Sequence, residues 1–176
     1  MTDKYIIRKE VIVNASQEKA FCVFTEGFDS WWPKTHHIAK VEMKESVMET
    51  KLGGRWYERG IDGSECEWGK VIAWEPPKRF ALTWQLTADY QYDPNFQTEV
   101  EVTFDSMGEG KTRVTLEHKN LDRYGKDMEK VKSSVGSEGG WGGIMRLYAA
   151  TANNEVAEIE KMSKDIAERM AERVAE

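Results

Sequence analysis

Three histidines are the residues best suited to acid–base chemistry, because the unperturbed pKa of histidine is about 6.5. His36 and His37 are adjacent in a segment whose composition is typical of a polar loop. His118 follows Val114 and Leu116 at intervals of two residues. Because side chains alternate between the two faces of a strand, its side chain is predicted to lie on the same apolar face as theirs. Two interpretations of His118 follow: a structural histidine satisfied by hydrogen bonds, or an inward-facing group that binds a ligand or transfers protons.

Seven tryptophans form the second group with chemical potential. Each combines a large apolar ring with one N–H donor, so it serves equally in a packed core or in the wall of a pocket. Their concentration in alternating segments and in one late helical segment favours an aromatic-lined site for a small molecule. The residues predicted to line this site, with His118 as its polar contact, are Trp56, Trp68, Trp84, Phe104, His118, Trp141 and Met145.

A cluster of charges surrounds the glycine pair at 53–54. Glu49 and Glu58 flank this turn, and Arg55 and Arg59 lie close to it in the chain. We expect ion pairs on the surface here, because long charged side chains are seldom buried. The alternative is that one carboxylate is a buried polar anchor for a ligand.

Motifs for metals, nucleotides and covalent catalysis are missing. The sequence contains no HExxH, no paired CxxC and no DxDxDG loop, so we predict no metal site. The segment 110–112 resembles the end of a phosphate-binding loop, but Asp105 stands where that loop requires glycine. No GxSxG motif marks a serine nucleophile. We therefore predict no cofactor and no catalytic residue from motifs alone.

The charge balance limits the kinds of binding partner that we expect. The chain of 176 residues has 31 acidic and 25 basic residues, a net charge of −6. Nucleic acid is not expected as a ligand, because polyanion binding needs a basic footprint. No run approaches the roughly 18 apolar residues of a membrane span, and the first residues lack the apolar core of a secretion signal. We expect a cytoplasmic protein without membrane contact.

The elements that must position these residues follow from periodicity. Residues 4–13 are rich in β-branched side chains and predict a first strand. Ser16 is a suitable N-cap for a short helical pair whose phenylalanines recur every three or four residues. From about 38 to 119 the period is two, which predicts six antiparallel strands with one dry face and one wet face.

The pattern of the last third of the chain predicts helices. Residues 122–136 are polar and predict a loop or a short helix. A helix beginning near Ser137 carries an apolar stripe, which consists of Trp141, Ile144, Met145, Tyr148 and Ala152. The charged, amphipathic extension 153–176 either docks on its own domain, frays, or pairs with a second chain as a homodimer.

This order of elements predicts an α+β fold. We expect a curved antiparallel sheet of about seven strands wrapped around a long C-terminal helix, in the order β-α-α-β6-α. Residues 1–152 form this domain and 153–176 an extension. Such a sheet does not have to close its interior, so large side chains from sheet and helix can bound a cavity.

Several short segments carry a resemblance to a known family. The chain resembles the helix-grip (START-like, SRPBCC) superfamily, and within it the bacterial domains similar to the C-terminal domain of the heat-shock chaperone ATPase activator. The resemblance covers residues 5 to about 152. The segments that carry it are GGRWYERG at 53–60, CEWGKV at 66–71, WEPP at 74–77, TEVEVTF at 98–104, GKTRV at 110–114, LEH at 116–118 and GW at 140–141.

The resemblance implies the fold more than the function, because one scaffold of this kind hosts binding, transport, cyclisation and co-chaperone roles. We predict binding of a small apolar or aromatic molecule between sheet and C-terminal helix, and we favour non-enzymatic binding because no catalytic motif is found. One alternative is a cyclase, aromatase or hydrolase in which His118 acts with a carboxylate. Another is a chaperone-associated interaction module that uses the charged extension. The separate N-terminal domain of the chaperone activator has no counterpart in this sequence, so chaperone contact is the weaker expectation.

Overall fold

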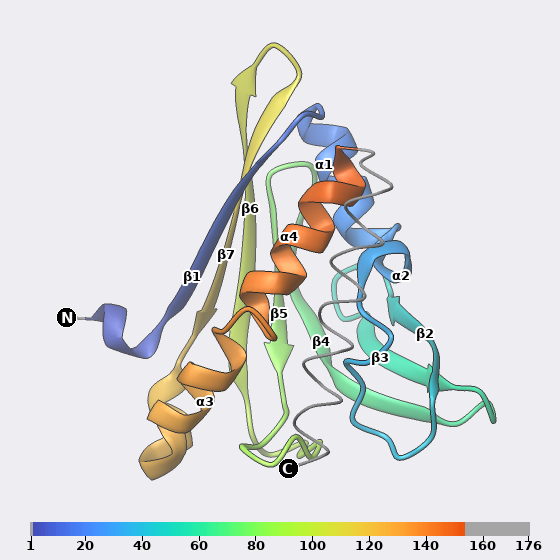
Figure 1. Ribbon diagram of the computed structural model, residues 1–176, viewed down its shortest axis with the longest axis vertical. Helices are drawn as coiled ribbons and strands as arrows, with labels where there is room; N and C mark the ends of the chain where they lie inside the picture. Colours follow the sequence, from blue (N-terminus) through green and yellow to red (C-terminus); the bar gives the residue numbers. More distant parts are fainter. Residues whose placement is uncertain (1, 154–176) are drawn as a thin grey trace.

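The computed structural model describes residues 2–153, so the predicted extension lies outside the described residues except for Asn153. The elements follow the predicted order of strand, helical pair, six strands and late helices (Figure 1). They are η1 (Thr2–Tyr5), β1 (Ile7–Val13), α1 (Gln17–Thr25), α2 (Phe28–Trp31), β2 (Met43–Met48), β3 (Arg55–Gly60), β4 (Glu65–Glu75), β5 (Arg79–Trp84), β6 (Thr98–Gly108), β7 (Lys111–Lys119), η2 (Leu121–Asp127), α3 (Met128–Val135) and α4 (Trp141–Ala152).

One antiparallel sheet of seven strands contains all of these strands, in the order β1-β7-β6-β5-β4-β3-β2. The first strand crosses over to pair with the last, from Ile7 opposite His118 to Val13 opposite Thr112. The other strands pair with their neighbours in sequence, as a meander does. The sheet curls around α4 (Figure 1), which confirms the predicted α+β helix-grip fold.

Burial follows the predicted alternation on most strands, but not on β5. Strand β6 alternates between buried and half-buried residues over its first half, as one dry face requires. Ala81 and Thr83 on β5 and Gln85 just after it were expected to be wet, but they are buried as well, so the prediction of one wet face is wrong there. The polar groups on this face are bonded within the protein instead of to water, since the Thr83 hydroxyl donates to the Gln85 side chain at 2.8 Å. Strand β4 also approaches β5 closely. A Cβ at Gly69 would lie 1.9 Å from the Thr83 carbonyl oxygen, and the Thr83 hydroxyl accepts the Lys70 N–H.

Helix α4 lies across the concave face of the sheet (Figure 1). It begins at Trp141 rather than near Ser137, because Gly140 has a non-helical backbone conformation. The Tyr148 hydroxyl donates to the Ala20 carbonyl at 2.7 Å and ties α4 to α1. The predicted stripe is buried as expected, and its members are Trp141, Ile144, Met145, Tyr148 and Ala152.

The end of the domain near α1 is packed solid. Phe104 lies in this part, with its ring centroid 5.1 Å from that of Phe21 and 5.9 Å from that of Phe24. Phe80 and Tyr148 complete the cluster, in which rings meet edge-on or tilted, the arrangements that aromatic pairs prefer. Aromatic rings in mutual contact therefore occupy this part of the interior.

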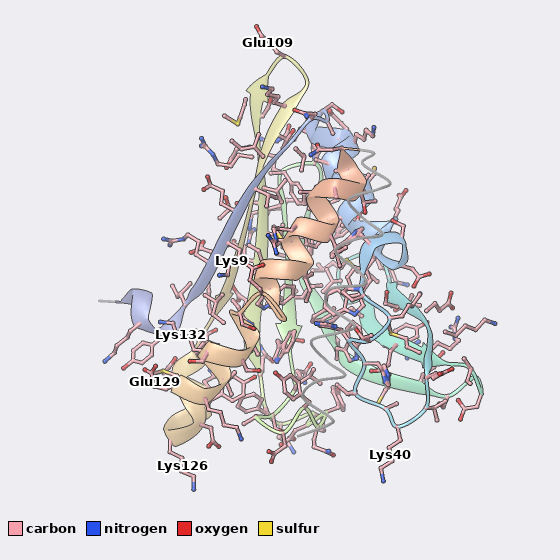
Figure 2. All side chains as sticks on the ribbon, in the orientation of Figure 1. Lys9, Lys40, Glu109, Lys126, Glu129 and Lys132 are labelled. Carbon is pink, nitrogen blue, oxygen red and sulfur yellow. The ribbon has the colours of Figure 1, made fainter. Side chains whose placement is uncertain are left out.

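The outside of the domain is strongly charged. Labelled side chains such as Lys40, Glu109 and Lys126 extend away from the body of the domain (Figure 2). Within residues 2–153, no helix is long and apolar enough to cross a membrane.

Candidate functional site

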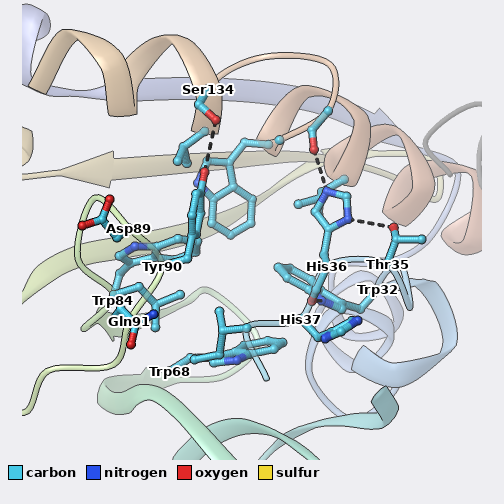
Figure 3. Close-up of a pocket in the computed structure, with 17 residues that line it drawn as sticks. Trp32, Thr35, His36, His37, Trp68, Trp84, Asp89, Tyr90, Gln91 and Ser134 are labelled. Atoms are coloured by element: carbon cyan, nitrogen blue, oxygen red, sulfur yellow. Dashed lines mark hydrogen bonds between the residues drawn. The ribbon is translucent and has the colours of Figure 1, made fainter. Parts of the chain in front are cut away.

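A cavity of about 280 Å³ lies between the concave face of the sheet and the beginning of α4 (Figure 3). This volume is close to the roughly 300 Å³ at which pockets for small ligands begin. Its walls come from four places: strands β4 and β5, the loop after α2, the loop between β5 and β6, and the junction of α3 with α4. The curl of the sheet therefore leaves room at one end while the other end is packed.

Four indole rings dominate the wall of the cavity, those of Trp32, Trp68, Trp84 and Trp141. The ring centroids of Trp32 and Trp68 are 5.2 Å apart, and those of Trp84 and Trp141 are 5.7 Å apart. Trp32 lies 6.0 Å from Trp141 and joins the two pairs. The rings thus form one aromatic wall, and Trp68, Trp84 and Trp141 were among the predicted lining residues.

The N–H groups of three of these indoles are satisfied by the protein itself. Trp32 donates to the His36 carbonyl at 3.0 Å, and Trp68 donates to the Glu58 carboxylate at 3.0 Å. Trp141 donates to a ring nitrogen of His118 at 3.1 Å. Because these donors are occupied, these rings offer a bound molecule apolar faces rather than hydrogen bonds.

His118 lies behind this wall and not on it. Its side chain is fully buried, with Nδ1 accepting the Trp141 N–H and Nε2 2.8 Å from the Thr98 hydroxyl. The Nε2–H therefore donates to Thr98, whose hydroxyl in turn donates to the Trp84 carbonyl at 3.2 Å. This chain of hydrogen bonds fixes the two tryptophans relative to each other, so His118 positions the wall.

Burial lowers the pKa of His118 from 6.5 to about 3, because a charged imidazole loses its hydration in the interior. The ring is neutral at physiological pH. The inward direction predicted for His118 is confirmed, and both of its nitrogens are committed to protein partners.

The other predicted site residues lie deeper than the cavity surface. Trp56 is fully buried and donates its N–H to the Thr83 carbonyl at 2.7 Å, behind Trp68. Met145 is equally buried on α4, and Phe104 belongs to the solid cluster near α1. None of these three lines the cavity. Trp56 supports the wall from behind through its contacts with Trp68 and Trp84, whereas Phe104 lies in the packed end of the domain.

Two loops that carried no signal in the sequence complete the site. His36 and His37, expected in a polar loop, line the cavity, and so does Tyr90 from the loop between β5 and β6. His36 Nε2 donates to the Gly139 carbonyl at 2.5 Å, and the Tyr90 hydroxyl lies 3.1 Å from that of Ser134. Both bonds connect a loop to the α3–α4 region across the rim (Figure 3).

Glu58 is the buried carboxylate of the site. Its side chain is 1% exposed. It accepts hydrogen bonds from the backbone N–H groups of Ile38 at 2.6 Å and Ala39 at 3.3 Å, and from the indole N–H of Trp68. It thereby anchors the loop after α2 to the sheet. The expectation of a surface ion pair is wrong for Glu58, because these three donors replace its water.

The neighbouring charges behave as expected of surface groups. Arg55 pairs with Glu49 at 3.6 Å, and Arg59 pairs with Glu65 at 3.2 Å. The hydrogen bonds of Glu65 to the two arginines lower its pKa. Among residues 2–153, no group of three or more histidine, cysteine or acidic side chains is arranged to hold a metal ion.

Comparison with known proteins identifies the family. The family model described as activator of Hsp90 ATPase homolog 1-like protein matches residues 14–152. The chain belongs to this family. The matched residues run from the turn after β1 to the last residue of α4, and so include the whole cavity.

Solved structures include close relatives of this family member. The anthrahydroquino-γ-pyrone synthase Txn09, complexed with the compound designated SUM, is 37% identical over 82% of this chain and 94% of its own, with a TM-score of 0.58. The self-sacrificing resistance protein CalC from Micromonospora echinospora is 33% identical over 86% and 96%, with a TM-score of 0.65. Protein NE0264 from Nitrosomonas europaea shares the fold at 14% identity over 88% and 98%, with a TM-score of 0.62. No curated protein matches the chain.

Proposed function

We propose that this protein binds a planar aromatic small molecule in the tryptophan-walled cavity. The observation that carries the proposal is the set of four indoles around about 280 Å³ of space. Stacking on aromatic faces favours flat ring systems, and such contacts add about 0.5–1.5 kcal/mol per ring pair beyond the buried area. The volume suits one molecule of a few fused rings.

The polar groups on the wall indicate what substituents such a molecule carries. His37, Asp89 and Gln91 line the cavity beside the indoles, and so do the hydroxyls of Tyr90 and Ser134. A few convergent polar groups in an apolar pocket orient a ligand through its own oxygen atoms. We therefore expect hydroxyl or carbonyl groups on the rings.

The relatives support both the class of molecule and two uses of it. Txn09 is named as an anthrahydroquino-γ-pyrone synthase, and CalC is named as a self-sacrificing resistance protein. Sequestration of an aromatic compound would need only the cavity. A cyclase-like reaction is the second candidate, favoured by the 37% identity to Txn09. Chromatography and mass spectrometry of the probe after incubation separate the two, because sequestration returns it unchanged.

Calorimetric titration with alizarin, a planar dihydroxyanthraquinone, tests binding. The variant Ser134→Phe places a ring at the cavity wall, whereas Ser133→Phe places the same ring on the exposed side of α3. We expect Ser134→Phe to weaken binding at least tenfold and Ser133→Phe to leave it unchanged. Equal affinity of both variants, or no binding by the wild type, contradicts the proposal.

A further inference from the structure

We propose that His37 and Glu58 form an acid–base pair in the cavity, in which His37 accepts the proton of an acidic hydroxyl on the bound aromatic molecule. The inference rests on the proposed binding function and adds a chemical step to it. It assigns this role to a histidine other than the one that the sequence pattern favours.

The first step of the argument is the state of Glu58. Its carboxylate is removed from water and held by three N–H donors, two from the loop after α2 and one from Trp68. Buried carboxylates are normally satisfied by donors of this kind together with a positive charge. The one ion-pair contact of Glu58 among the described residues is with His37, whose Nδ1 lies 3.9 Å from Oε2.

The second step is the orientation of the His37 ring. Its Nδ1 lies 2.8 Å from the Ala39 carbonyl, and a carbonyl only accepts, so Nδ1 carries the hydrogen in the neutral ring. The lone pair is then on Nε2, which bonds to no described residue. The side chain lines the cavity and is 24% exposed, so Nε2 can accept a hydrogen bond from a bound molecule.

Neither of the other histidines has both features. His36 also lines the cavity, but its Nε2 donates to Gly139 and its Nδ1 accepts from the Thr35 hydroxyl at 3.1 Å. His118 is enclosed between Trp141 and Thr98 and has no access to the cavity. Of the three histidines, only His37 both lines the cavity with an available ring nitrogen and has a buried carboxylate close to its other ring nitrogen.

The transfer is balanced within the site. The O–H bond of the ligand breaks, its electron pair stays on the oxygen, and a new N–H bond forms at Nε2 of His37. The products are a phenolate and an imidazolium, and the imidazolium then has Glu58 on one side and the phenolate on the other. The other ionisable groups on the cavity wall are His36, Asp89 and Tyr90, and Asp89 adds a second carboxylate.

The probe for this pair is alizarin, because its visible absorption differs strongly between phenol and phenolate. At a mildly acidic pH where free alizarin is mostly phenol, we expect the wild type to raise the phenolate fraction of the bound probe at least threefold. The variant His37→Gln should bind alizarin but lose this increase. Lys40→Gln introduces the same residue at an exposed position of the same loop, outside the cavity lining, and should keep it.

A second measurement does not depend on any variant folding. In ¹⁵N spectra of the wild type, the ring nitrogens of His37 should move to imidazolium positions when alizarin binds. Binding without this change, or an unaltered phenolate fraction in His37→Gln, overturns the acid–base pair and leaves the binding function standing. Absence of binding by calorimetry overturns the binding function itself.

Discussion

Lowering the pH from 7 to 5 should destabilise the wild type more than the variant His118→Gln. Burial lowers the pKa of His118 from 6.5 to about 3, whereas the unfolded chain titrates near 6.5. Between these two pKa values, His118 is protonated in the unfolded chain but not in the folded protein. The free energy of unfolding therefore falls as the pH falls. The contribution is fully present above pH 6.5 and is lost progressively toward pH 3.

The magnitude follows from the distance to the unfolded pKa. At pH 5 the solution is about 1.5 pH units below it, and each unit is worth about 1.4 kcal/mol, so the loss is about 2 kcal/mol. A glutamine at position 118 carries no titratable proton. Its amide can accept from Trp141 and donate to Thr98, and so can replace the two hydrogen bonds of His118.

Urea denaturation of both proteins at pH 7 and pH 5, followed by tryptophan fluorescence, provides the assay. The carboxylates titrate in both proteins, so their effect cancels in the difference between wild type and variant. The wild type should lose about 2 kcal/mol more than His118→Gln. An equal loss in both, or a measured pKa of His118 near 6.5 in the folded protein, refutes the account of this residue.

Three further substitutions test the supports of the site by the same denaturation assay at pH 7. Gly69→Ala should destabilise by about 3 kcal/mol, because the added Cβ meets the Thr83 carbonyl oxygen at 1.9 Å; a loss below about 1 kcal/mol contradicts this contact. Tyr148→Phe should cost about 1 kcal/mol by removing the hydrogen bond that ties α4 to the Ala20 carbonyl of α1, and an unchanged midpoint would show that the bond contributes nothing. Glu58→Gln should cost about 2 kcal/mol: the amide oxygen can keep the bonds from Ile38 and Trp68 at Oε1, but the amide nitrogen at Oε2 then faces the Ala39 N–H, and the negative charge is lost. A neutral effect would remove the carboxylate from its anchoring role.

The sheet and the covering helix could be predicted because their residues obey simple periods. One buried face gives period two on the antiparallel strands, and the Trp141-to-Ala152 stripe gives the helical period. The prediction failed on β5, where both faces are buried. On this face Thr83 bonds to the Lys70 N–H and to the Gln85 side chain, and such hydrogen bonds leave no trace in the local hydrophobic pattern of β5.

The site was only partly accessible to the same reasoning. Trp68, Trp84 and Trp141 were predicted correctly as lining residues because residue type and the direction of the side chain were enough to place them on the cavity wall. Phe104 shares the direction of Trp84, but the curl of the sheet places it in the packed end rather than at the cavity. Loop residues show no hydrophobic periodicity, so the sequence does not predict which of them face the cavity. His37 and Glu58 meet across 21 positions in the chain through the bonds that anchor the loop after α2.

A crystal structure of the protein with alizarin tests the central claim most directly. The account predicts the rings of the probe between the indoles of Trp32, Trp68, Trp84 and Trp141, with a hydroxyl oxygen within hydrogen-bond distance of Nε2 of His37. A probe bound on the outer surface, with the four indoles collapsed onto one another and the space between them closed, would contradict it.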